Sequence, residues 1–203
     1  MLFKKDAKKF SLLIVVQLVF ILLVAQPGVP ITKWTADGSS YYAVEKKEIV
    51  KIELPSQNKT VFISRKQLIT KNADTLSPAS FQLSLDGKLA LIYTNTQKVW
   101  RYKTRGDYWL LNLATGDLKQ IGKGRPTASL QFAKFSPDSK KVAYVSERNI
   151  YSEDLATGTI KKLTSDNGTK KLINGTFDWV YEEEFSCRDS LRANAMCHQD
   201  RGA

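Results

Sequence analysis

Histidine and cysteine are scarce in this chain of 203 residues. The sequence contains one histidine, His198, and two cysteines, Cys187 and Cys197. A structural zinc site usually needs four nitrogen or sulfur ligands, and two cysteines close together near one end do not define a disulfide framework. We therefore expect no metal site and no bound cofactor.

The residues of a serine hydrolase are also missing. No Gly-x-Ser-x-Gly motif occurs, and His198 is the only histidine that could serve as a base. Cys197 and His198 are neighbours in an irregular stretch, where nothing would hold them in the geometry of nucleophilic attack. The sequence therefore predicts no catalytic residue in these 203 positions.

Positive charge is in excess. The chain has 31 basic and 20 acidic residues and a formal net charge of +11. Such a balance can indicate nucleic acid or an anionic membrane as partner. The lysines are scattered from Lys46 onward, and no nucleic-acid-binding motif collects them. We interpret them as a solvated surface and expect no nucleic-acid partner.

Four lysines at the start of the chain have a separate explanation. Lys4, Lys5, Lys8 and Lys9 precede an apolar run over residues 10–25. A basic segment followed by an apolar stretch is typical of an export signal. The run of about 16 residues is shorter than the roughly 20 that cross a bilayer. We therefore favour a cleaved signal peptide over residues 1–26, with membrane anchoring through residues 10–25 as the alternative. Either predicts an exported protein, periplasmic or extracellular.

Beyond this segment, short alternating apolar and polar stretches are separated by similar turns. The first kind of turn reads Thr35-Ala36-Asp37-Gly38, Ser84-Leu85-Asp86-Gly87 and Ser136-Pro137-Asp138-Ser139. The second kind reads Asn112-Leu113-Ala114-Thr115-Gly116 and Asp154-Leu155-Ala156-Thr157-Gly158, with a looser copy over residues 52–57. Alternation between such turns predicts antiparallel strands joined by hairpins.

The two kinds of turn alternate, so each block contains four strands and repeats every 40 to 50 residues or so, as β-propeller blades do. Three blocks fit between residues 31 and 164. The predicted fold class is all-β, a partial β-propeller of about three four-stranded antiparallel blades preceded by a hydrophobic export helix. Three blades cannot close a ring of the usual four to eight, so we expect an incomplete domain.

An insertion interrupts the second block. Residues 94–106 read TNTQKVWRYKTRG, in which Trp100 and Tyr102 alternate with basic residues. Insertions on a rigid scaffold often carry function, but a long hairpin with solvated charges is an equally good interpretation of this composition.

Three consecutive glutamates, Glu182, Glu183 and Glu184, lie beyond the third block and directly after the segment Asp178-Trp179-Val180-Tyr181. Adjacent carboxylates repel one another and remain ionised most easily in water or beside a cation. Composition alone favours a solvated acidic turn.

The segment Asp178 to Glu184 resembles the acidic motif of the dipeptidyl peptidase IV family. That resemblance implies a short helical insertion in which Glu183 and Glu184 bind the free N-terminal ammonium of a peptide substrate. Trp100 and Arg101 are similar to a second family feature, which implies that Arg101 contacts a backbone carbonyl of the substrate. The resemblance covers residues 31–189.

Membership of this family implies further expectations. Its triad lies on a C-terminal α/β-hydrolase domain, its members are often homodimeric, and the chain alone should be inactive. After Asp189 the sequence no longer resembles the family, so residues 190–203 are interpreted as an aberrant tail produced by a frameshift or a truncated gene model. We predict the N-terminal propeller fragment of a serine dipeptidyl aminopeptidase. The alternatives are a non-catalytic exported propeller that serves as a binding module, and a short protein with a role of its own.

Overall fold

The computed structural model describes residues 31–185. The chain divides into two parts, Met1–Pro30 and Ile31–Ala203, and all described residues lie in the second. Several sequence-based expectations concern residues outside this range and stay predictions. They are the export helix, the statements on Cys187, Cys197 and His198, and the aberrant tail over residues 190–203. Within residues 31–185, no helix has the length and apolar character that a membrane span requires.

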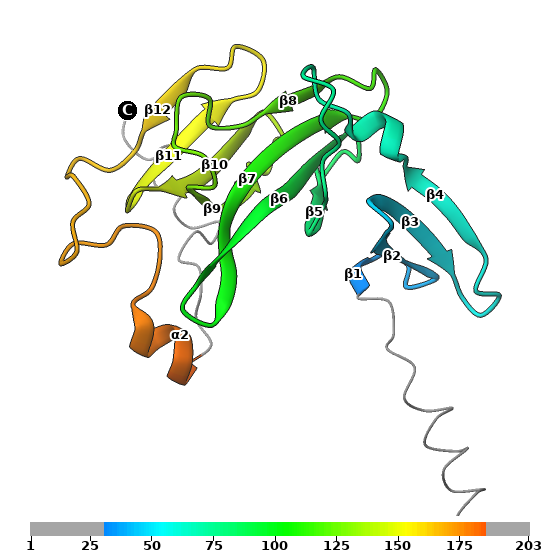
Figure 1. Ribbon diagram of the computed structural model, residues 1–203, viewed down its shortest axis with the longest axis horizontal. Coiled ribbons are helices and arrows are strands. Elements are labelled where there is room, and N and C mark those ends of the chain that lie inside the picture. Colours follow the sequence, from blue (N-terminus) through cyan, green and yellow to red (C-terminus); the bar gives the residue numbers. More distant parts are fainter. Residues whose placement is uncertain (1–30, 186–203) are drawn as a thin grey trace, which may run out of the picture. The chain divides into compact units, whose positions relative to one another are not determined.

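The described chain contains twelve antiparallel strands (Figure 1). They form three groups of four consecutive strands, which we call the first, second and third blade. The first blade contains β1 (Ile31–Trp34), β2 (Ser40–Glu45), β3 (Glu48–Glu53) and β4 (Lys59–Ile63). The second contains β5 (Ser80–Leu83), β6 (Leu89–Val99), β7 (Tyr102–Asn112) and β8 (Leu118–Gln120). The third contains β9 (Leu130–Phe135), β10 (Lys141–Ser146), β11 (Asn149–Asp154) and β12 (Ile160–Lys162). A short 3-10 helix, η1 (Arg65–Leu68), follows β4, and one α-helix, α2 (Trp179–Phe185), follows the third blade.

The predicted all-β class and the antiparallel strand blocks are confirmed. Of the two interpretations of the insertion over residues 94–106, the long hairpin is confirmed, because β6 continues to Val99 and β7 begins at Tyr102.

The first kind of turn repeats its hydrogen bonds in each blade. In the second blade, the Ser84 hydroxyl donates to Asp86 Oδ1 at 2.6 Å and accepts from the Leu89 amide at 2.9 Å. In the third blade, the Ser136 hydroxyl does the same with Asp138 and Lys141, at 2.5 and 2.9 Å. The sequence pattern places a hydroxyl residue two positions before an aspartate. The hydroxyl donates to that carboxylate and accepts from the backbone of the following strand, and this stabilises the turn.

The carboxylates of these turns are held in the charged form. Hydrogen bonds from Thr35 and Ser39 lower the pKa of Asp37 to about 2. The hydroxyls of Ser84 and Ser136 likewise lower the pKa of the aspartates in the other two turns. A hydrogen bond to the ionised form favours that form, so the turns keep their geometry across the neutral range.

Two apolar clusters lie between the blades. One joins the first and second blades, and its buried members are Ile49, Ile63, Leu68, Leu76, Phe81, Ala90, Ile92 and Leu111. The other joins the second and third blades, and its buried members include Leu91, Tyr108, Leu110, Ile121, Leu130, Val142, Tyr144 and Tyr151. Ala90 and Ile92 thus contribute to the first cluster and Leu91 to the second, as side-chain alternation along a strand requires.

Backbone pairing also joins the second and third blades. Arg105 and Gly106 of β7 pair antiparallel with Gln131 and Leu130 of β9, so an eight-stranded sheet runs from β5 to β12. The insertion that lengthens β7 therefore supplies the strand segment that contacts the third blade.

A buried carboxylate lies at this second boundary. Glu153 on β11 is 4% exposed, and its Oε2 accepts a hydrogen bond from the Gly122 amide at 2.8 Å. Burial raises the pKa of Glu153, and the bond from Gly122 and the charge of Lys119 oppose that rise. The folded chain therefore holds this proton more strongly than the unfolded chain does.

The cluster between the first and second blades should carry much of the stability of the fold. Leu111 is fully buried, whereas Leu85 in a turn is 84% exposed. We expect Leu111→Ala to lower the free energy of unfolding by about 2 to 5 kcal/mol and Leu85→Ala to change it by less than about 0.5 kcal/mol. Denaturant titration followed by circular dichroism measures both, and equal losses would contradict the packing described.

Glu153 should make stability depend on pH. Because its pKa is raised in the folded state, its contribution is fully present below the ordinary glutamate pKa of 4.5 and is lost as pH rises through the folded value. Glu153→Gln keeps an acceptor for the Gly122 amide and removes the titration. We expect the variant to gain stability over the native chain as pH rises from 4 towards 7, measured as the difference in unfolding midpoints. A difference that does not change with pH would contradict this account.

Candidate functional site

The β6–β7 hairpin forms the first wall of the candidate site. Its turn consists of Trp100, in a left-handed conformation with φ of 53°, and Arg101. Trp100 is 46% exposed, so its side chain is accessible at the tip of the hairpin.

Side-chain contacts hold the strands of this hairpin together. The rings of Tyr93 and Tyr108 stack with their centroids 4.7 Å apart, and the Tyr93 hydroxyl donates to the Lys103 carbonyl at 2.9 Å. Burial raises the pKa of Tyr93 to about 12, so its hydroxyl remains a donor. Gly106 lies so close to the opposite strand that a Cβ there would come within 2.6 Å of the Thr94 carbonyl oxygen. The position therefore requires glycine.

The segment between β12 and α2 forms the second wall. The amide oxygen of Asn149 accepts from the Thr164 hydroxyl at 3.1 Å and from the Gly168 amide at 3.0 Å. Further along, the Asn174 amide donates to the Arg148 carbonyl at 3.3 Å. These bonds hold the segment against Arg148 and Asn149, where the turn between β10 and β11 ends.

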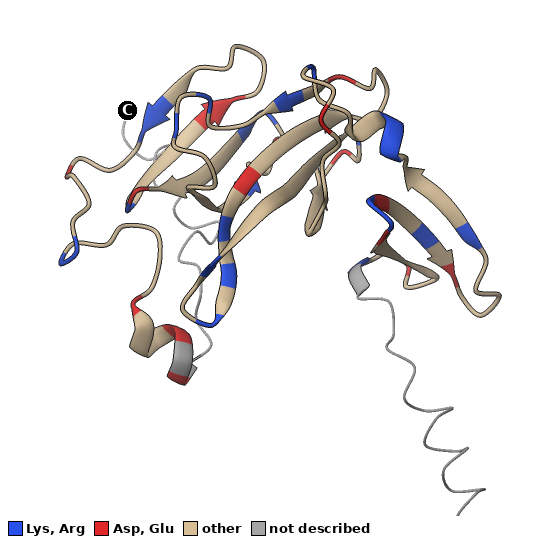
Figure 2. Cartoon of the chain, viewed as in Figure 1, with Lys and Arg blue, Asp and Glu red and all other residues tan. Residues whose placement is uncertain are grey.

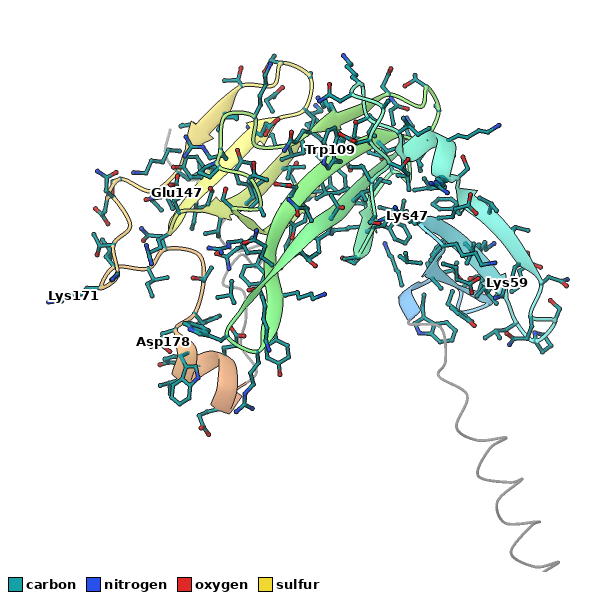
Figure 3. The ribbon with its side chains drawn as sticks, in the orientation of Figure 1. Lys47, Lys59, Trp109, Glu147, Lys171 and Asp178 are labelled. Carbon is teal, nitrogen blue, oxygen red and sulfur yellow. The ribbon has the colours of Figure 1, made fainter. Side chains whose placement is uncertain are left out.

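Helix α2 begins immediately after Asp178, whose position is labelled in Figure 3. The Asp178 carboxylate accepts a hydrogen bond from the Tyr181 amide at 3.0 Å, as an N-cap residue does. The rings of Phe177 and Tyr181 stack with centroids 5.7 Å apart across the same turn. The aspartate that opens the acidic segment thus has a structural role of its own, because it fixes the start of the helix that carries the three glutamates.

A cavity of about 470 Å³ lies between these two walls. Residues from five segments line it: Val99, Trp100, Thr104 and Arg105 of the hairpin; Ser129, Gln131 and Phe132 at β9; Glu147 and Arg148; Lys170, Ile173, Thr176 and Phe177; and Glu182 of α2. Its volume is within the range of small-ligand pockets. The hairpin turn and the acidic helix therefore reach one cavity, although about 80 residues separate them in the sequence.

Opposite charges meet around this cavity. Figure 2 shows basic residues along the far end of the hairpin and acidic residues on α2. The lining side chains include Arg105, Arg148 and Lys170 on one hand and Glu147 and Glu182 on the other. Such a lining can bind the two unlike ends of a zwitterionic or polar ligand.

The three predicted substrate-binding residues lie on the two segments that reach the cavity, but none of them lines it. Glu183 and Glu184 lie on α2, and Arg101 lies in the hairpin turn beside Trp100. Glu184 is exposed, and the side chain of Glu183 falls outside the description. Neither these glutamates nor Arg101 are among the lining residues of the cavity, so their role in binding stays a prediction.

Sequence reasoning missed several residues of the site. Glu182 was given no role, yet it is 5% exposed and lines the cavity. Phe132 reaches the cavity from a left-handed backbone position, with φ of 54°, near a register shift between β9 and β10. A bulge of this kind leaves no signature in one sequence, so only the structure could reveal it.

Comparison with known proteins identifies what the chain is similar to. The family described as the dipeptidyl peptidase IV N-terminal region matches residues 84–192. A probable dipeptidyl-aminopeptidase B of Arthroderma gypseum is 35% identical over 129 residues, which cover 64% of this chain and 14% of that protein. Another, from Ajellomyces dermatitidis, is 30% identical over 160 residues, which cover 78% of this chain and 17% of that protein.

A solved structure shares the fold. The crystal structure of Porphyromonas gingivalis dipeptidyl peptidase 4 superposes with a TM-score of 0.68 at 23% identity, covering 80% of this chain and 23% of that one. The likeness supports the propeller-type arrangement of the blades. The matched part of the chain spans only about a seventh of the length of the Arthroderma gypseum relative.

The cap of α2 can be tested without knowing the ligand. We expect Asp178→Ala to cost the first turn of α2 about 1 kcal/mol and to speed hydrogen exchange at the Tyr181 amide about fivefold. Asp178→Asn, which keeps a good capping side chain, should exchange like the native chain. Exchange measured by NMR checks both, and an unchanged rate in Asp178→Ala would show that the carboxylate does not cap the helix.

Proposed function

Since this chain belongs to the dipeptidyl peptidase IV N-terminal-region family, we propose that it forms the substrate-gripping part of a dipeptidyl aminopeptidase and recognises the free N-terminus of a peptide. The observation that carries the proposal is the cavity that the hairpin turn and the acidic helix share through Trp100 and Glu182. A basic hairpin and an acidic helix that reach one cavity suit a ligand with unlike polar ends better than they suit a plain scaffold.

The chemistry of an amino terminus fits an acidic helix. A peptide ammonium has three donors and no acceptor, whereas ionised carboxylates only accept. Glu183 and Glu184 would share this ammonium, and each charge-assisted hydrogen bond would contribute about 1.5 to 3 kcal/mol. The bound cation would also relieve the repulsion between the neighbouring carboxylates.

The basic hairpin suits the backbone carbonyl groups that follow the substrate's amino terminus. Arg101 carries five fixed N–H donors, which suit a peptide carbonyl oxygen. Since the hairpin and α2 are fixed by separate contacts, a peptide held at both would be oriented as well as bound. Because the free amine would be bound at a fixed place, the peptide bond two residues further along would always lie at the same distance from it. Release of a dipeptide requires such a fixed distance.

Cleavage itself is assigned to another part of the relatives. The sequence contains no Gly-x-Ser-x-Gly and only one histidine, His198. We therefore propose that the nucleophile belongs to a C-terminal α/β-hydrolase domain with which this chain would act, and that family members pair as homodimers. Export to the periplasm or the extracellular space, with residues 1–26 as signal peptide or anchor, would bring the site to peptide substrates.

The dependence on a free amine gives a direct test. We expect the full chain to bind the tripeptide Ala-Pro-Ala measurably and to leave it intact, and to bind its N-acetylated form at least about tenfold more weakly, because acetylation removes the ammonium. Glu184→Gln should weaken binding of the free peptide by a similar factor. Isothermal titration calorimetry measures all of these.

Glu45→Gln is the matched control, because it removes the same charge from β2 in the first blade. It should leave the affinity for Ala-Pro-Ala unchanged. Equal affinities for the free and acetylated peptides would contradict the proposal and favour a binding module with no requirement for an amine. Release of a dipeptide by the chain alone would contradict the assignment of cleavage to another domain.

A further inference from the structure

A second cavity, of about 480 Å³, shares no lining residue with the first. It lies between the connection from β4 to β5 and the strands of the second blade. Its lining residues are Thr70, Asn72, Asp74, Thr75, Leu76, Ser77, Thr94, Asn95, Asp107, Trp109 and Gln120. Nothing in the proposed recognition of a peptide amine uses them.

The connection that forms one wall is fixed by its own hydrogen bonds. The Thr70 amide donates to the Asp74 carbonyl at 2.8 Å, which closes a tight turn. A bridge between Ile69 and Thr75 continues that turn, and the Thr94 hydroxyl on β6 donates to the Ser77 carbonyl at 2.8 Å. The wall is therefore held to the blade and does not depend on a ligand for its shape.

Hydrogen-bonding groups dominate the lining. Asp107 is 7% exposed, and its two oxygens accept from the Ala128 amide and from the Asn95 side chain, each at 2.7 Å. A carboxylate offers about four acceptor positions, so each oxygen can still accept a hydrogen bond. Among the described residues, the Thr70 hydroxyl is buried and has no hydrogen-bond partner, which leaves a donor and acceptor for a ligand.

Trp109 supplies the apolar part of the cavity. It lies on β7, is labelled in Figure 3, and packs against the apolar cluster between the first and second blades. Its partner across the β7–β8 pairing is Gln120 of β8, whose exposed side-chain amide can both donate and accept hydrogen bonds. An indole beside amide, hydroxyl and carboxylate groups suits a ligand that has an apolar ring face and a polar rim.

The charge of the lining narrows the ligand further. Its only ionisable side chains in the described part of the chain are the carboxylates of Asp74 and Asp107, and no lining residue is basic. A phosphate or carboxylate ligand would meet uncompensated negative charge there. No group of three or more candidate metal ligands occurs among the described residues either.

We propose that this cavity binds a carbohydrate, as one or two uncharged or amine-bearing sugar rings. The ring would lie against Trp109, and its hydroxyls would hydrogen-bond with the side chains of Asp107, Gln120 and Thr70. The volume falls in the range of small-ligand sites. Open, polar sites of this kind bind single sugars weakly, so a dissociation constant of about 1 mM is expected.

The experiment titrates the full chain with glucose, glucosamine and N-acetylglucosamine, and with glucose 6-phosphate as the anionic comparison. Binding is followed by NMR shifts of the tryptophan indole signals. We expect the Trp109 indole to shift with at least one uncharged or amino sugar, and the signals of Trp34 and Trp100 to stay in place. Glucose 6-phosphate should bind at least about tenfold more weakly than glucose, because of the two carboxylates.

Variants locate the binding. Gln120→Ala and Asp74→Asn alter exposed side chains and should weaken sugar binding about three- to tenfold without unfolding the chain. Trp109→Phe keeps an aromatic ring and should retain most of the affinity that Trp109→Leu loses. Trp34→Leu, which alters an exposed tryptophan in the first blade, is the control and should bind like the native chain.

Three outcomes would overturn the proposal. They are no saturation with any of the sugars up to about 50 mM, binding that neither Gln120→Ala nor Asp74→Asn weakens, and equal affinity for glucose and glucose 6-phosphate. Loss of peptide binding by the glutamate variants would not affect this test, because the two cavities share no residue.

Discussion

Each four-stranded blade has two sheet faces to bury, and the structure depends on neighbouring blades covering them. A sheet that carries apolar side chains on both faces leaves apolar surface exposed unless a neighbour covers each face. The strand β6 shows the consequence most clearly, since Ala90 and Ile92 pack towards the first blade and Leu91 towards the third. Both cavities of the described chain are lined by residues of the blades and of the segments that connect them.

The strand repeat that produces the stacking could be predicted from the sequence, because the turns between its strands are stabilised by local contacts. Asp37, Asp86 and Asp138 each accept bonds from residues within two positions, so the turns need no distant contacts to form. Strand alternation between such turns is enough to predict the blades. The length of β6 and β7 was not predictable in the same way, because residues 94–106 contain no strand pattern strong enough to exclude a loop.

The cavity between the hairpin and α2 could not be predicted from the sequence, and the binding roles of Glu183, Glu184 and Arg101 stay predictions. The acidic segment and the Trp100–Arg101 pair could be singled out as residue types, since both are unusual beside a strand repeat. Only Trp100 and Glu182 of these two segments line the cavity, with Asn149 binding the segment after β12 and Phe132 reaching the cavity from a left-handed backbone position. Contacts of that kind join residues far apart in the chain, and a single sequence carries no record of them. For the same reason, the burial of Glu182 could not be separated from the exposure of Glu184.

The pairing of β7 with β9 has a mechanical meaning for the first cavity. The hairpin that forms one wall and the blade that supports the other wall belong to one hydrogen-bonded sheet. The hairpin wall therefore cannot move away from the third blade without breaking the backbone hydrogen bonds between β7 and β9. Any change in the width of the cavity would have to come from the segment between β12 and α2, which lies outside the sheet.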